Sequence, residues 1–122
     1  MTAVLWVALG SAFGAPARYL LDRLIQTRHE RIFPWGTWVI NVSGSFGLGL
    51  VTAMADHHLL DSWVVPAVGI GFLGGYTTFS TFSWETLRLI EEGAVAAAVL
   101  NVATTVAMTL AAAAAGLLLG SA

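Results

Sequence analysis

Residues 69–85 read GIGFLGGYTTFSTFSWE, and they lie inside an uncharged run over 62–84 that is long enough to cross a bilayer. Two adjacent glycines, followed one residue later by two adjacent threonines, disfavour a straight helix. Backbone groups freed from helical pairing in hydrocarbon are costly unless they line a cavity, bind an ion or are buried against protein. The stretch therefore predicts a helix broken in mid-membrane, with one half before Gly74 and another after Thr78.

Aromatic and hydroxyl side chains follow the predicted break. Phe79 and Phe82 are three residues apart, and Ser80 and Thr81 lie between them. Helical spacing places the two rings on one stripe with hydroxyl groups beside them. The edge of a phenyl ring carries partial positive charge, so rings turned edge-on among hydroxyl donors can coordinate a small anion. The alternative is that the rings pack against neighbouring helices and the hydroxyls bond to the preceding turn.

The composition is that of an integral membrane protein. Of 122 residues, 57% are hydrophobic and 10% are charged, whereas a soluble domain carries about 25% charged residues. The chain has no cysteine, which excludes disulfides and thiolate metal sites. No basic patch suggests nucleic acid, and no residue set supports covalent or hydrolytic chemistry. The sequence therefore predicts one small membrane domain over residues 1–122, without enzymatic activity.

Four hydrophobic segments predict four transmembrane helices per subunit, so the fold class is all-α. The first segment is rich in small residues, which let helices approach closely, and the third contains the break. The small-residue faces also imply that a second subunit supplies part of any pore wall, which predicts a dimer. The predicted segments cover residues 3–25, 35–55, 63–90 and 94–119.

Polar side chains stand out on the second and fourth segments. Asn41 lies inside the second. On the otherwise apolar fourth segment, Asn101, Thr105 and Thr109 stand at i, i+4 and i+8, which places them on one line along a helix. One interpretation is interhelical hydrogen bonding, worth about 0.6–2 kcal/mol per contact. The other is that these groups line an ion path, since an amide in hydrocarbon needs a partner.

Two charged residues fall at or near membrane depth, where charge is expensive and usually functional. Arg18, near the end of the first segment, can reach the interface, pair with Asp22 one turn later, or attract anions at a pore mouth. Glu85, on the third segment, is spaced to pair with Arg88. We take Arg18 and Glu85 as candidate residues of a pore vestibule.

Three motifs, each on its own segment, carry a family resemblance. They read GSAFGAPARY over 10–19, GTWVINVSGSF over 36–46 and GGYTTFSTF over 74–82. In this order they resemble the Fluc (CrcB-type) fluoride channel family, and the four-segment layout covers nearly the whole chain. The family pattern commonly has Phe where this chain has Tyr76, which keeps the ring and adds a hydroxyl.

The resemblance implies a passive channel that exports F⁻ across the bacterial inner membrane and so confers fluoride resistance. Two subunits would pack in antiparallel orientation, with dual topology, into a homodimer with two pores. In this family the residues matching Asn41, Phe79 and Phe82 line the pore, and a polar rail on the fourth segment borders it. A structural Na⁺ at the dimer interface is held by backbone oxygens that match Gly74 and Thr77.

The distribution of arginine argues against dual topology. With four segments, Arg23, Arg28, Arg31 and Arg88 all lie toward one side of the membrane, and the other side has no arginine. The positive-inside rule then favours one orientation, with both termini outside. The family resemblance implies little bias, so the sequence leaves both topologies open.

Two other functions compete with the channel. A small proton-coupled multidrug exporter, also an antiparallel dimer, needs an acid embedded in its first segment, and this chain offers only Asp22 near that segment's end. Glu85 is the deepest other acid. A non-transporting assembly subunit would use the glycines and hydroxyls for packing alone, and it would tolerate Leu or Ile in place of Phe79 or Phe82.

Overall fold

The computed structural model describes residues 1–28 and 32–122. Positions 29–31 lie outside the described residues, and the predicted contribution of Arg31 to the charge bias lies there with them.

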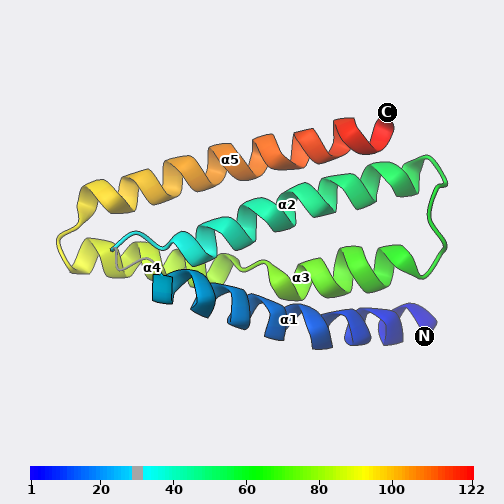
Figure 1. The fold of residues 1–122 in the computed structure, drawn as a ribbon, viewed down its shortest axis with the longest axis horizontal. Coiled ribbons are helices and arrows are strands. Elements are labelled where there is room, and N and C mark those ends of the chain that lie inside the picture. Colours follow the sequence, from blue (N-terminus) through cyan, green and yellow to red (C-terminus); the bar gives the residue numbers. More distant parts are fainter. Residues whose placement is uncertain (29–31) are drawn as a thin grey trace.

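The described helices run antiparallel in four passes (Figure 1). α2 packs along α5 and α1 packs along the third pass, and both termini lie at the same end of the bundle. Three helices, α1, α2 and α5, are long and apolar enough to cross a membrane, with mean hydropathies of 1.3, 1.4 and 2.0. The predicted all-α class is confirmed, and four passes fit the structure. In chain order the elements are α1 (Thr2–Arg28), α2 (Trp35–Asp56), η1 (Val65–Phe72), α3 (Leu73–Tyr76), α4 (Phe79–Glu91) and α5 (Val95–Ser121).

The third pass differs from its prediction in two ways. It begins with a π-helix, η1, which continues into α3, so the helix runs through Gly74 instead of ending before it. Its last turn is held at Thr77, whose N–H and Oγ1 both donate to the Leu73 carbonyl at 2.9 Å. The backbone is then extended at Thr77 (φ −78°, ψ 158°) and Thr78 (φ −151°, ψ 120°), and α4 starts at Phe79.

Both ends of α4 are capped by local sequence. Thr78 is the N-cap, and its Oγ1 accepts from the Thr81 N–H at 3.1 Å. At the other end Gly93 has φ +81°, a left-handed conformation that glycine adopts without strain. The N–H of Ala94 donates to the Leu89 carbonyl at 2.8 Å, which closes the helix end. These caps explain why a helix of only 13 residues starts and stops so sharply.

Glycines let α1 and η1 approach to backbone contact. A Cβ built at Gly10 would meet the Ala67 carbonyl oxygen, and one at Gly14 would meet the Phe72 carbonyl oxygen. Between them, Ser11 Oγ donates to the Gly71 carbonyl at 3.1 Å. The predicted role of small residues in close helix packing is therefore seen in α1.

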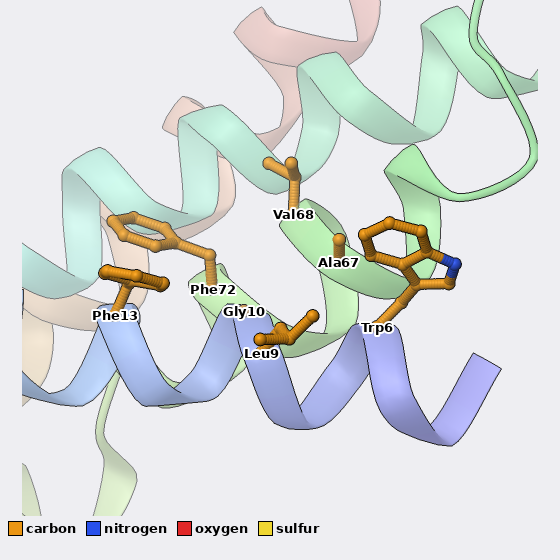
Figure 2. A pocket seen from close by; sticks show the side chains of 7 residues that line it. All are labelled: Trp6, Leu9, Gly10, Phe13, Ala67, Val68 and Phe72. Atoms are coloured by element: carbon orange, nitrogen blue, oxygen red, sulfur yellow. The ribbon is translucent and has the colours of Figure 1, made fainter. Parts of the chain in front are cut away.

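An apolar groove of about 410 Å³ runs along this contact (Figure 2). Trp6 stands near one end of the labelled set, and Phe13 and Phe72 lie near the other. Trp6 also packs on Trp63, with ring centroids 5.3 Å apart, as aromatic residues do at a membrane interface. The groove is lined by Trp6, Leu9, Gly10, Phe13, Ala67, Val68 and Phe72.

We expect Gly14→Ala to lower thermal stability much more than Gly69→Ala, although each adds one methyl group. At Gly14 the new Cβ would meet the backbone of Phe72, whereas at Gly69 it would stand 3.4 Å from a methyl of Val51, an ordinary contact. Overpacking costs about 1–3 kcal/mol. The unfolding midpoint of the purified protein in detergent should fall by several degrees for Gly14→Ala only, and equal midpoints would contradict the close backbone contact.

Candidate ion pathway

Asn41 joins α2 to the extended residues that separate α3 from α4. Its Oδ1 accepts from the Thr78 N–H at 2.8 Å, and its Nδ2 donates to the Thr78 carbonyl at 2.9 Å. Both residues are 8% exposed, so this contact is buried. The amide oxygen satisfies the Thr78 N–H, which the interrupted helix leaves without a helical acceptor, and the amide nitrogen gives the Thr78 carbonyl a donor from another helix. Its second Nδ2 hydrogen has no acceptor among the described residues, so it can donate to another group.

A groove of about 270 Å³ lies beside this contact. Its lining comes from α2, from the extended residues 77–78, from α4 and from α5, and no charged side chain contributes among the described residues. Five predicted pathway residues are brought together here: Asn41, Phe79, Phe82, Thr105 and Thr109. The others that line it are Ser45, Leu48, Thr77, Thr78 and Val106.

The two phenylalanines hold different positions. Their ring centroids are 5.6 Å apart and their planes are tilted by 51°. Phe82 is 9% exposed, whereas Phe79 is 79% exposed. Phe82 therefore belongs to the interior wall of the groove, and Phe79 lies at its exposed rim.

Two hydroxyl groups of the groove, those of Ser45 and Thr109, bond to the backbone of their own helices. Ser45 Oγ donates to the Asn41 carbonyl and Thr109 Oγ1 to the Thr105 carbonyl, each at 2.7 Å. A hydroxyl has one hydrogen and rotates freely, so each group can turn this hydrogen toward an anion in the groove and return it afterwards. The groove thus offers donors that carry no full positive charge.

Three predicted pathway residues do not line the groove. Asn101 is 1% exposed; its amide nitrogen donates to the Thr86 hydroxyl and its amide oxygen accepts from the Thr105 hydroxyl. Ser80 and Thr81 stay in the first turn of α4, where both hydroxyls lie within hydrogen-bond distance of Thr78 Oγ1. Asn101 lies between the helices, where its side chain bonds to Thr86 of α4, so its predicted role in the ion path stays a prediction.

The candidate vestibule residues lie apart from the groove lining. Glu85 accepts a short hydrogen bond from Thr37 Oγ1 of α2. Arg88, the predicted partner of Glu85, instead pairs with Glu92 at 2.9 Å. Within the part of the chain that the structure describes, Arg88–Glu92 is the one ion pair, so Arg18 and Asp22 do not form the predicted salt bridge.

Among the polar residues, Ser45 and Thr78 line the groove but were not predicted pathway residues, and Thr37, the partner of Glu85, was not predicted either. Thr37 stands one turn before Asn41, and Ser45 stands one turn after it, so α2 carries a polar rail at i, i+4 and i+8 like that on α5. This spacing was the available signal for Thr37. The role of Thr78 depends on its contact with α2, which no local pattern reveals.

The carbonyls of Gly74 and Thr77 lose their helical donors at the interruption. In a continuous helix they would accept from the N–H groups of Thr78 and Thr81. The Thr78 N–H donates instead to Asn41, and the Thr81 N–H donates to the Thr78 hydroxyl. A Cβ built at Gly74 would meet nothing within 4 Å, so the space beside it is open. Two carbonyl oxygens without helical donors beside open space suit a hard cation such as Na⁺.

The long apolar helices define a multi-pass membrane protein. An uncharged groove with polar donors is the kind of wall that a membrane pore uses for an ion. The family described as CrcB-like protein, Camphor Resistance (CrcB), matches residues 5–117. The chain belongs to this family.

Relatives from several bacteria are similar over nearly their whole length. A protein of Frankia casuarinae named "Fluoride-specific ion channel FluC 1" is 50% identical over 117 residues, which cover 92% of this chain and 91% of the relative. A protein of Streptomyces avermitilis with the same name is 47% identical, with 92% and 90% covered. The "Fluoride-specific ion channel FluC" of Magnetococcus marinus is 43% identical, with 96% of each chain covered. The predicted resemblance to fluoride channels is confirmed.

Proposed function

We propose that this protein is a fluoride-selective ion channel that lets F⁻ leave the cell passively and so confers fluoride resistance. The observation that carries the proposal is the uncharged groove at the Asn41–Thr78 contact, where the Asn41 amide, rotatable hydroxyls and the rings of Phe79 and Phe82 line one volume. Relatives that share 43–50% identity bear the name of fluoride channels, and the predicted non-enzymatic class agrees with theirs.

The mechanism follows from the weakness of each donor. Fluoride is small and strongly hydrated, so a pore must replace its water shell. The Asn41 N–H, the groove hydroxyls and the ring edges each supply part of this replacement. Because none of them carries a full charge, the ion is bound loosely enough to move on. Proton-coupled drug export is not supported, since the described part of α1 offers no acid deeper than Asp22 and the relatives bear channel names.

The proposed function is tested by growth. Expression of the chain in a bacterial strain that lacks its own fluoride exporter should restore growth in millimolar fluoride, because passive export lowers the internal concentration. Unchanged sensitivity, with the protein shown to be present in the membrane, would contradict fluoride export.

The channel is proposed to be an antiparallel homodimer in the bacterial inner membrane. The groove of one subunit lacks a wall on the side where Phe79 is 79% exposed. A second copy can supply that wall and bury this ring. Two opposite orientations would also cancel the excess of arginine on one side of a single subunit. The family resemblance supports this arrangement. It would be established if the purified protein is a dimer and if the termini are labelled equally on both faces of the membrane.

We further propose that Na⁺ stabilises this dimer through the carbonyls of Gly74 and Thr77, two from each subunit. The bound ion would supply only positive charge to these oxygens, which lack helical donors. Replacing Na⁺ with a large organic cation is expected to lower the free energy of unfolding of the dimer by RT ln(1 + [Na⁺]/Kd). The unfolding midpoint should fall with it. A midpoint that is the same with either cation would contradict a sodium site.

A further inference from the structure

Asn101 and Thr86 form the one side-chain hydrogen bond between α4 and α5 in the described chain. Asn101 Nδ2 donates to Thr86 Oγ1 at 2.9 Å. The direction is fixed at Thr86, because its single hydroxyl hydrogen donates to the Phe82 carbonyl at 2.8 Å. The other end of the amide, Asn101 Oδ1, accepts from the Thr105 hydroxyl at 3.3 Å. These bonds form a relay from Thr105 through Asn101 and Thr86 to the backbone of Phe82.

Both ends of the relay line the groove, and its two middle residues do not. Thr105 and Phe82 are lining residues, whereas Asn101 is 1% exposed and packed between helices. The middle residues therefore cannot touch an ion in the groove, and any effect they have on conduction passes through Phe82 or Thr105.

The cross-helix bond distinguishes Thr86 from Thr52, which makes a similar local bond. Thr52, on α2, donates to the Leu48 carbonyl at 2.7 Å in the same i to i−4 manner, and no hydrogen bond from another helix reaches it in the described chain. At Thr86 the same local bond is joined to α5 through Asn101. The bond thus fixes the turn of α4 that carries Phe82 relative to the wall formed by α5.

We infer that Thr86, held by Asn101, is a positioning residue for Phe82 in the ion pathway. The inference rests on the proposed channel function. A ring whose edge coordinates an ion must be held to within about 0.5 Å. α4 has few polar ties that can do this: Asn41 at Thr78, Thr37 at Glu85, and Asn101 at Thr86. Only the third tie also bonds to the backbone of Phe82, because the Thr86 hydroxyl donates to the Phe82 carbonyl at 2.8 Å.

The test compares Thr86→Val, Thr86→Ser and the matched control Thr52→Val in liposomes. Valine has the shape of threonine without its hydroxyl, and serine keeps the hydroxyl. We expect Thr86→Val to lower fluoride efflux per channel by about tenfold, which corresponds to about 1.4 kcal/mol, and to lower the ratio of fluoride to chloride efflux. Thr86→Ser and Thr52→Val should stay close to the unaltered protein.

A second variant separates positioning from stability alone. Thr86→Val leaves the Asn101 amide buried without its acceptor, which destabilises the fold, whereas Thr86→Val with Asn101→Leu leaves no unpaired amide. We expect this double variant to regain the unfolding midpoint but not the efflux rate. If Thr86→Val alone does not fold, fluoride efflux is measured on the double variant instead.

Three results would overturn the inference: efflux of Thr86→Val within twofold of the unaltered channel, an equal loss in Thr52→Val, or recovery of efflux in the double variant. In each case the unaltered protein still conducts fluoride, so the proposed function stands. Absence of efflux from the unaltered protein would instead contradict the proposed function itself.

Discussion

Asn41→Asp is expected to lower fluoride efflux by roughly two to three orders of magnitude. The change keeps the size of the side chain but removes the N–H groups, one of which donates to the Thr78 carbonyl at 2.9 Å. It also places a carboxylate on the wall of the groove. Two like charges about 4 Å apart repel by about 4 kcal/mol near a protein surface, and each 1.4 kcal/mol is about tenfold in rate. Efflux from liposomes measures the loss.

Asn41→Leu separates the two causes. It removes both bonds to Thr78 and adds no charge, so it should conduct less than the unaltered protein and more than Asn41→Asp, at equal amounts of folded dimer. Unaltered efflux in both variants would show that the ion path does not pass the Asn41–Thr78 contact.

Phe82→Ile is expected to lower fluoride efflux by about tenfold or more. Isoleucine fills part of the space of the ring, which is 9% exposed in the groove, but it has no edge with partial positive charge. The loss of about 1.4 kcal/mol or more of ion stabilisation gives this factor. The rate of fluoride efflux at matched protein content is the measurement.

Phe13→Ile provides the matched control for this change. Phe13 lies on α1 beside the apolar groove, 70% exposed and away from the candidate pathway. It should leave efflux unchanged. A subunit that serves assembly alone would show no dependence on either ring, so equal behaviour of the two variants would favour that function over a channel.

The helical passes could be predicted because their signals are local. Hydrophobic length gave the second pass as 35–55, and the structure has Trp35–Asp56. The weakness of the third pass was also visible in its adjacent glycines and threonines. The residue at which α3 ends could not be predicted from these residues, because Gly74 and Gly75 stay helical and Thr77 completes the last turn. The π-helical geometry of η1 has no periodicity that the sequence displays distinctly from an α-helix.

The candidate site was predictable where helical spacing alone places side chains, and not where helices meet. Asn41, Phe82, Thr105 and Thr109 all line the groove, as their spacing suggested. Asn101 shares the rail of Thr105 and Thr109, yet it turns to Thr86 because α4 crosses α5 at that turn. Arg88 pairs with Glu92, and Glu85 instead accepts a hydrogen bond from Thr37 of α2, a contact between helices that no local pattern reveals.

Ion flux from liposomes that contain the purified protein tests the central claim most directly. Liposomes loaded with fluoride and liposomes loaded with chloride are diluted in parallel into sodium-containing buffer, and ion-selective electrodes follow the release. We expect rapid fluoride efflux with negligible chloride efflux. Equal release of both ions, or no release of either from well-folded protein, would contradict a fluoride-selective pathway at the Asn41–Thr78 groove.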